Sequence, residues 1–273
     1  NWMYPFLSPH GLIMKINAEH RHLDRDVTRD DLAFWDWYTR RLLRDPMFRR
    51  DLPAQKSFSK LRSAIAGLYA SRGMRREAEK AFQEARTLYP VSPEANFRLI
   101  QEVLLQQSRY DEAILILEEY NARDPNNERG SGFVDFIRRV QATEDKVREL
   151  TAKAKTSGNL SPDEAFELAL AQRELGQNEV AARYLVQLAG LSNLPVARLF
   201  EIGAALRGLR KNAEAAKAMD GVMMRLPPDM PPDKLLEIVR VFGEAGQTEK
   251  MLLPMSRYLQ MAPNDWQAWL DMA

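Results

Sequence analysis

The 273-residue chain has no cysteine, which excludes disulfide bonds, thiolate nucleophiles and cysteine-containing metal sites. It also has no run of about 18 consecutive apolar residues, the minimum for a membrane-spanning helix. The formal net charge is only +1, so no global field favours nucleic acid or an anionic membrane. With 45% hydrophobic and 28% charged residues, however, the composition is that of an ordered protein.

Motifs that carry chemistry are also missing. The sequence has no phosphate-binding glycine loop, no dinucleotide fingerprint, and no His-Glu-x-x-His or Gly-x-Ser-x-Gly motif. Its three histidines, His10, His20 and His22, stand among charged residues near the start, where a polar loop is a better interpretation than a metal site. We therefore expect no catalytic residue, no metal, no cofactor and no enzyme activity in this chain.

A repeated pattern takes the place of these motifs. In the segment 59–90, apolar residues such as Ile65 and Tyr69 recur at helical spacing, Gly73 marks a turn, and Phe82 belongs to a second amphipathic helix that a proline ends. The same order of residues recurs in the segments 94–125, 162–195, 196–227 and 233–263. The pattern predicts five helical hairpins, each with more apolar surface than its own two helices can cover.

Five hairpins that close on proline, or within two residues of one, resemble the tetratricopeptide repeat (TPR). The resemblance implies an all-α fold: an α-solenoid of TPR-like hairpins forming a right-handed superhelix, preceded by an irregular N-terminal element. An irregular helical bundle is the alternative. Arg62 and Ala165 depart from the pattern, since the family prefers a large apolar residue there, and Met251 replaces a small one.

This pattern divides the chain into four parts. We expect an irregular leader and a Trp-rich helix packing on the first repeat in 1–55, two repeats in 56–125, a long helix or degenerate repeat in 126–161, and three repeats with a terminal half-repeat helix in 162–273. In the half-repeat, Trp266, Trp269 and Met272 are predicted to belong to a capping helix.

The leader and the Trp-rich helix carry specific expectations. We predict a helix over 28–44 with Thr28 as its cap and Asp30 and Asp31 as first-turn charges. Trp35 and Trp37 cannot share a face of this helix, so one of them must lie at an edge. The apolar leader residues are expected to pack on this helix or on the first repeat; they are Tyr4, Phe6, Leu7, Leu12, Ile13 and Ile16.

If the chain is a TPR array, the first helices of its hairpins line a concave groove. Matched to the inward positions of the family, the candidate binding residues are Arg98, Glu102, Gln106, Phe166, Arg173, Phe200, Arg207, Arg240 and Glu244. A row of arginines over an apolar floor would suit a peptide with carboxylates; the alternative is that these arginines are simply solvated. The clamp that some TPR proteins use for a C-terminal carboxylate is absent, because Glu102 stands where asparagine would be needed.

Charge is unevenly distributed along the chain, although the net charge is only +1. Between Arg40 and Pro90, thirteen Lys and Arg residues accompany five Asp and Glu residues. This end could meet an anionic lipid surface, or these could be solvated helix faces paired with the acidic second repeat. Nucleic acid is not expected as a partner, because the aromatic residues here follow the buried periodicity and leave no stacking platform.

The phrases YPFLSPHGLIMKIN, TRRLLRDP and KSFSKLRSAIAGLYASRG (4–17, 39–46 and 56–73) resemble the soluble C-terminal region of a bacterial family of multi-pass membrane proteins of unknown function. That family is distantly related to protein O-mannosyltransferases. The resemblance implies a piece of a longer, membrane-tethered protein with an extracytoplasmic or periplasmic location. We therefore expect a non-catalytic protein–protein interaction module with a protein or peptide ligand. A free cytoplasmic TPR scaffold and a subunit of a soluble enzyme remain as alternatives.

Overall fold

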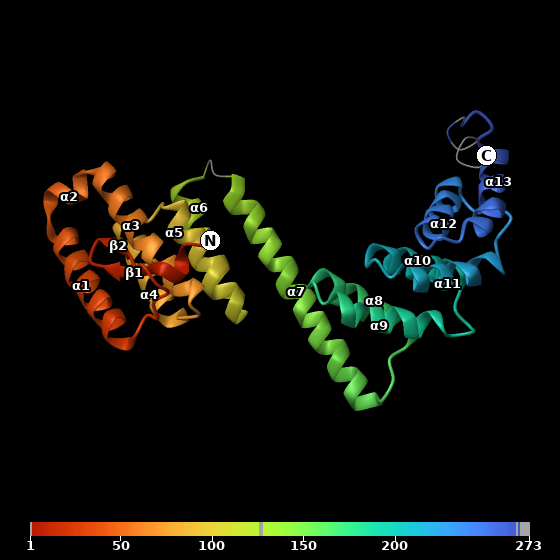
Figure 1. Ribbon diagram of the computed structural model, residues 1–273, viewed down its shortest axis with the longest axis horizontal. Helices are drawn as coiled ribbons and strands as arrows, with labels where there is room; N and C mark the ends of the chain where they lie inside the picture. The colour runs from red at the N-terminus through yellow and green to blue at the C-terminus, as the bar shows by residue number, and fades with distance from the viewer. Residues whose placement is uncertain (1, 126–127, 266, 268–273) are drawn as a thin grey trace. The chain divides into compact units, whose positions relative to one another are not determined.

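The computed structural model describes residues 2–125, 128–265 and 267 and divides into two units, Asn1–Gln141 and Ala142–Ala273. Each unit consists mainly of helices packed in antiparallel pairs around its own apolar core (Figure 1). The predicted all-α array of helical hairpins is therefore confirmed. The superhelical course of the array stays a prediction.

Unit 1 opens with a small β-hairpin and continues with helices. Its elements are η1 (Tyr4–Phe6), β1 (Leu7–His10), β2 (Ile13–Ile16), α1 (Arg25–Arg44), α2 (Pro46–Arg50), α3 (Leu52–Ser71), α4 (Arg75–Leu88), α5 (Pro93–Leu99), the π-helical turn η2 (Ile100–Leu104), η3 (Leu105–Gln107) and α6 (Tyr110–Arg123). The strongest pair is α3 with α4, and α5 continues the packing against both. Helix α3 begins four residues before the expected start of the first repeat.

Unit 2 contains three further hairpins. Its pairs are α8 (Pro162–Glu174) with α9 (Asn178–Ala189), α10 (Val196–Gly208) with α11 (Asn212–Met223), and α12 (Pro232–Glu244) with η4 (Thr248–Met251) and α13 (Leu252–Met261). Residues 126–161, for which the sequence left two interpretations, contain one helix, α7 (Glu128–Ser157), which contributes residues to both units. The predicted capping residues Trp266, Trp269 and Met272 lie outside the described residues.

The sequence predicted an irregular leader, and this prediction is wrong. The leader folds as an antiparallel hairpin in which Leu7 pairs with Ile16 and His10 with Ile13. Gly11 adopts φ +62° at the first position of the two-residue turn, a conformation that glycine adopts at little cost. Strand β1 is buried and contacts α1 and α3, whereas β2 is the outer strand. Because β2 lies outside, Ile13 and Ile16 are 61% and 65% exposed, and their predicted packing on the helices is wrong.

Helix α1 starts three residues earlier than expected, at Arg25. The Asp24 side chain accepts a hydrogen bond from the Val27 backbone N–H at 2.8 Å, so Asp24 caps the helix and Thr28 does not. As predicted, the two tryptophans lie on different faces: Trp35 is fully buried and Trp37 is 53% exposed. The Trp35 indole N–H donates to the Gly11 carbonyl at 3.0 Å, which fastens the hairpin to the helix.

A buried ionic cluster holds α1, α3 and α4 together. Arg62, one of the departures from the repeat pattern, is fully buried and donates to Asp31 at 2.8 Å and to Glu84 at 2.7 Å. The Tyr69 hydroxyl donates to the same Asp31 oxygen at 2.7 Å. Asp31 is thus a buried partner of Arg62, and its predicted role as a first-turn charge is wrong, because α1 starts at Arg25. The hydrophobic position of the repeat is occupied here by a charge that binds α1.

Contacts between successive hairpins follow a common rule. A basic side chain at the turn of one hairpin reaches a carboxylate on the second helix of the hairpin before it. The pairs are Arg109–Glu79 at 2.8 Å, Lys211–Glu179 at 3.0 Å and Lys250–Asp220 at 2.7 Å. These charged side chains therefore bind one hairpin to the next.

The hairpin turns give a stability prediction. The turn residue has a left-handed conformation in five hairpins, but it is glycine in only three (Gly73, Gly176 and Gly246), with φ between +70° and +75°. Arg210 adopts φ +59° at the equivalent position of the fourth, where a side chain is strained. We expect Arg210→Gly to raise the free energy of unfolding by roughly 1 kcal/mol in urea titrations.

The reverse change is the control for this prediction. A Cβ at Gly246 would meet no atom within 4 Å, so Gly246→Ala changes only the backbone preference and should lower stability by a similar amount. Equal stability of Arg210→Gly and the wild type would contradict the argument from strain.

The buried cluster gives a prediction for alkaline pH. Burial, and then the charge of Asp31, raise the pKa of Tyr69 well above its usual value of 10. The unfolded chain therefore loses this proton above pH 10 while the folded chain keeps it, so stability falls as pH rises. We expect the wild type to lose up to about 1.4 kcal/mol per pH unit there from Tyr69 alone.

The variant Tyr69→Phe isolates this contribution. It cannot ionise, so its free energy of unfolding should fall less steeply above pH 10 than that of the wild type, although it is less stable at pH 8 for want of the bond to Asp31. Parallel alkaline slopes for the two proteins in urea titrations would refute the assignment.

Candidate functional site

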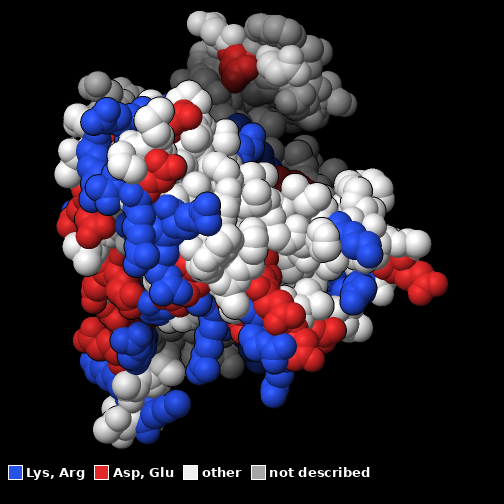
Figure 2. Space-filling view, turned by 90° about the vertical axis from the view of Figure 1, so that its left-hand side faces the viewer, with Lys and Arg blue, Asp and Glu red and all other residues white. Residues whose placement is uncertain are grey.

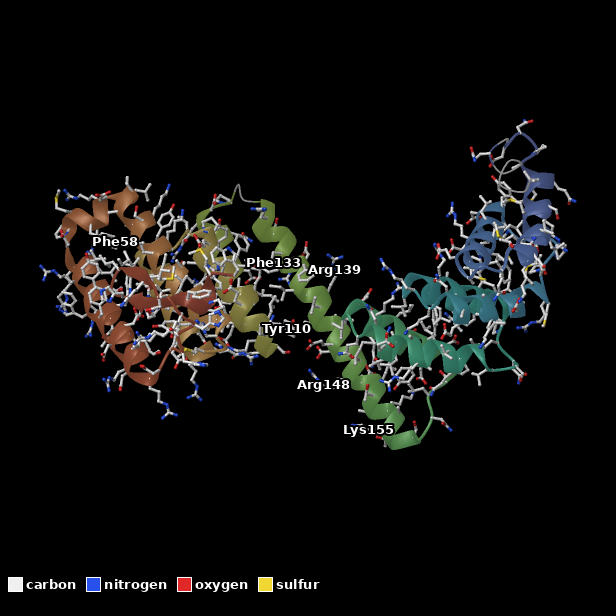
Figure 3. The ribbon with its side chains drawn as sticks, in the orientation of Figure 1. Phe58, Tyr110, Phe133, Arg139, Arg148 and Lys155 are labelled. Atoms are coloured by element: carbon white, nitrogen blue, oxygen red, sulfur yellow. The ribbon has the colours of Figure 1, made fainter. Side chains whose placement is uncertain are left out.

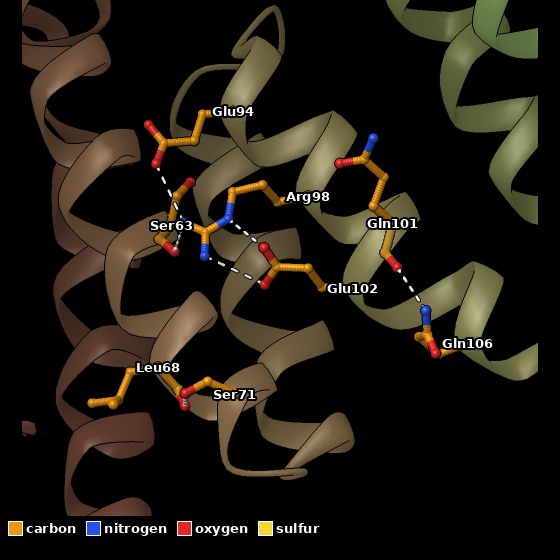
Figure 4. Close-up of polar contacts among 8 residues, drawn as sticks. All are labelled: Ser63, Leu68, Ser71, Glu94, Arg98, Gln101, Glu102 and Gln106. Atoms are coloured by element: carbon orange, nitrogen blue, oxygen red, sulfur yellow. Dashed lines mark hydrogen bonds and ion pairs between the residues drawn. The ribbon is translucent and has the colours of Figure 1, made fainter. Parts of the chain in front are cut away.

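The first candidate site is a pocket of about 450 Å³ on unit 1, between α3 and the helix formed by α5 and η2 (Figure 4). Its floor is made of small residues of α3 and its wall of polar side chains. The lining residues are Tyr4, Gly67, Ala70, Ser71, Gly73, Arg75, Arg98, Gln101, Glu102 and Gln106. Three of the nine residues predicted for the groove, Arg98, Glu102 and Gln106, meet in this pocket.

The wall of this pocket is shaped by the π-helical turn η2. The turn inserts an extra residue into the helix after Leu99 and is followed by the 3₁₀ turn η3, so the side chains beyond it are rotated relative to a regular α-helix. The Gln106 side chain donates to the Gln101 carbonyl at 3.4 Å (Figure 4). Interruptions of this kind are frequent at functional sites, because they reposition side chains at a cost in regular hydrogen bonding.

Arg98 is held at the centre of the pocket. Its guanidinium donates to Glu102 at 2.7 Å and to Glu94 and the Ser63 carbonyl at 3.3 and 3.4 Å (Figure 4). A Cβ at Gly67 would lie 1.7 Å from its Nη2 atom, so glycine is what permits this close approach to α3. Partial burial acts to lower the pKa of Arg98, but the bond to Glu102 outweighs it and the pKa is raised. Arg98 is therefore a permanent cation that is already neutralised.

A second pocket, of about 400 Å³, adjoins the first. It is lined by Phe97, Gln101, Arg129 and Phe133, and Gln101 belongs to both pockets. The rings of Phe97 and Phe133 are 5.8 Å apart and tilted, and Phe133 projects from α7 toward the other helices of unit 1 (Figure 3). The first pocket is mainly polar, the second is aromatic, and the exposed Gln101 lies between them; we refer to the two pockets together as the groove of unit 1.

The arginines predicted for unit 2 do not form a free row. Arg207 donates to Glu244 and to Glu237, both at 2.9 Å, and these bonds raise its pKa although desolvation by partial burial acts to lower it. Arg240 is 65% exposed and lies 3.9 Å from the same Glu237, and Arg173 is exposed as well. Of the expected row of cations, Arg207 alone is thus neutralised by glutamates of the next hairpin.

The predicted apolar floor of unit 2 is also covered. Phe166 is 6% exposed and lies under the Arg198 guanidinium, 4.3 Å from its carbon to the ring centroid. Phe200 is half-buried beneath the Lys234 ammonium at 5.4 Å. Neither ring faces an open groove, because cations of the following hairpin lie over both.

Most residues of the groove on unit 1 carry no signal in the sequence. Gln101 was not among the candidates, since its orientation depends on the π-turn, and Phe133 lies in the segment that lacks the repeat pattern. Tyr4 reaches the pocket from the leader. The one available signal was the turn after the second repeat's first helix, where Ser108 replaces the usual glycine.

A metal site and a membrane-spanning helix are two further features that would bear on function. In the part of the chain that the structure describes, no three His, Asp or Glu side chains gather as a metal site would require. Over 2–125, 128–265 and 267, no helix combines the length and the apolar character needed to cross a bilayer.

Comparisons with known proteins add likenesses of fold only. The sequence matches no protein-family profile, and no curated protein matches it. Among solved structures it is similar to YrrB, described as a TPR protein with an unusual peptide-binding site, at 16% identity over 77% of this chain and 90% of that one, with a TM-score of 0.32. It is also similar to PilW, a type IV pilus biogenesis factor, at 12% identity over 89% and 98%, TM-score 0.32.

A third structure, PilF of Pseudomonas aeruginosa, is 14% identical over 90% of this chain and 97% of that one, with a TM-score of 0.30. Values this low leave the function to be argued from the residues of the chain itself.

Proposed function

We propose that this protein is a protein–protein interaction module of the TPR type, and that unit 1 binds an extended peptide segment in the groove formed by its two adjoining pockets. The observation that carries the proposal is that Gln101, which lies within the π-turn η2, lines both pockets. A regular helix would have served the packing of the hairpin without this interruption.

The lining indicates what such a segment offers. The rings of Phe97 and Phe133 suit one apolar or aromatic anchor. Ala70 and Gly73 leave room for the peptide backbone to approach the end of α3, and the amide of Gln101 can both donate to it and accept from it. The aromatic anchor and the main chain therefore account for most of the recognition.

The ligand need not be strongly acidic, contrary to what a free row of arginines would favour. Arg98 is bonded to Glu94 and Glu102, so it offers little net positive charge. Arg75 is exposed at the edge of the first pocket and can pair with a single carboxylate.

We further propose that the module belongs to a membrane-tethered protein and works on the extracytoplasmic side. This rests on the resemblance of the leader, the Trp-rich helix and the start of the first repeat to the soluble region of a bacterial membrane-protein family. Under this proposal the chain is the non-catalytic part of a glycosyltransferase-like protein. A free cytoplasmic scaffold and an enzyme subunit are the alternatives that its location would distinguish.

The groove is tested by selecting peptides from a random display library on the purified chain. We expect recovered sequences to share one aromatic or large aliphatic residue, and Gln101→Ala and Phe133→Ala each to weaken binding of a selected peptide about tenfold in titration calorimetry, by removing one hot-spot contact.

Matched controls lie elsewhere on the chain. Gln187 is an exposed glutamine of α9, and Phe136 stacks on Phe133 at 6.0 Å but does not line the pocket. Gln187→Ala and Phe136→Ala should leave the affinity unchanged. If the controls lose as much as the pocket variants, or if no peptide is enriched, the groove is not a binding site.

The location is tested with a single introduced thiol, because the chain has no cysteine of its own. Lys155 is an exposed residue near the end of α7 (Figure 3). In the full-length gene product, with any cysteine outside this chain replaced by serine, Lys155→Cys should react in intact cells with a maleimide that cannot cross the inner membrane. Labelling only after lysis would place the module in the cytoplasm.

A further inference from the structure

The corner formed by the end of α1, helix α2 and the start of α3 combines positive charge with exposed apolar side chains. From Trp37 to Lys60 the chain has a net charge of +5. Its basic residues are Arg40, Arg41, Arg44, Arg49, Arg50, Lys56 and Lys60. Figure 2 views unit 1 from this side, and Lys and Arg side chains gather over the upper left of the face it shows.

The acidic residues of the corner are engaged with the backbone. Asp45 accepts from the Met47 N–H at 2.8 Å and Asp51 from the Ala54 N–H at 2.9 Å, so the two carboxylates cap α2 and α3. Arg44 and Arg50 are exposed and form no ion pair within the described residues. Unlike Arg207 of unit 2, these two arginines are available to an external anion.

Exposed apolar side chains lie among these cations. Trp37 is 53% exposed, Met47 74% and Leu52 47%. Trp37, Arg41 and Arg44 are spaced four and three residues apart and form one stripe of α1, with the Arg41 guanidinium 5.7 Å from the Trp37 ring centroid. Met47 follows Arg44 by three residues, so the two α-carbons are at most about 10 Å apart.

The corner is fixed in this orientation by its own contacts. Phe48, on the inner side of α2, is 6% exposed and its ring lies 5.9 Å from that of Phe58, which Figure 3 labels. The Arg49 Nε atom donates to the Leu43 carbonyl at 2.7 Å, and the Gln55 amide donates to the Phe48 carbonyl at 3.1 Å. Burial of Phe48 leaves Met47 facing outward, and the capped helices hold it there.

We propose that this corner docks on an anionic lipid surface, with Trp37, Met47 and Leu52 entering the headgroup region and Arg44 and Arg50 meeting lipid phosphates. Tryptophan with aliphatic neighbours favours the membrane–water interface, and Lys and Arg close to the surface add attraction to anionic lipids. Charge complementarity alone would also admit nucleic acid. Met47 and Leu52, however, offer no stacking platform for bases and cost free energy when exposed.

The test uses flotation of the purified chain with vesicles of phosphatidylcholine, with or without phosphatidylserine. We expect binding to the anionic vesicles that decreases with added salt. Arg44→Gln with Arg50→Gln should lower the partition coefficient about tenfold or more, since each cation near the surface contributes to the attraction. Trp37→Ser with Met47→Ser should lower it by a similar factor at unchanged charge.

The control removes the same charge from unit 2. Arg183 and Lys217 are exposed, and Arg183→Gln with Lys217→Gln should bind vesicles as the wild type does. Circular dichroism melting verifies that each variant is folded.

Three results would overturn the proposal: no binding of the wild type to anionic vesicles, an equal loss in the unit 2 control, or equally tight binding to a single-stranded oligonucleotide that the corner variants abolish. The corner shares no residue with the peptide groove, so peptide affinity should be unchanged in the Arg44 and Arg50 variant. Failure of either proposal can thus be told from failure of the other.

Discussion

Unit 1 depends on one buried cation. The Arg62 side chain has no exposed surface, and it bonds to Asp31 of α1 and Glu84 of α4 while its guanidinium lies 5.1 Å from the Trp35 ring centroid. Removing one member of such a pair leaves an unpaired charge in the interior, which costs about 3–5 kcal/mol. Burial raises the pKa of Glu84 despite the nearby Arg62. The cluster thus requires all three helices in one arrangement.

The buried cluster also fixes the position of the leader. Trp35, which packs on Arg62, also bonds to the turn of the β-hairpin at Gly11, and Arg72 at the end of α3 donates to the Tyr4 carbonyl at 2.8 Å. The hairpin is therefore attached to the first repeat at two points. Tyr4 can line the pocket beside Arg98 because these bonds hold the leader against α3.

Many charged side chains of the array form ion pairs with other residues of the chain, so cations without such a partner stand out as candidates for binding. Cations at the turns pair with the preceding hairpin, and Arg98 and Arg207 pair with glutamates close by. The cations at the corner near Met47 differ, because Asp45 and Asp51 cap helices; Arg40 pairs with Asp36, but Arg44 and Arg50 form no ion pair within the described residues. The polar and aromatic groove of unit 1 and the basic, apolar corner are consequently two separate surfaces with different chemistry.

The sequence by itself determined the hairpins, their turns and the all-α class, because helical periodicity and turn glycines are local properties that repetition makes visible. It also required Trp35 and Trp37 to lie on different faces of α1. It did not reveal the β-hairpin, whose pairing depends on the buried face of β1, nor the role of Asp31, whose partners Arg62 and Tyr69 are 31 and 38 residues away. Only the tertiary structure decided that Arg207 is neutralised by Glu237 and Glu244 and that Gln101 lines two pockets, since these contacts join residues that no local pattern links.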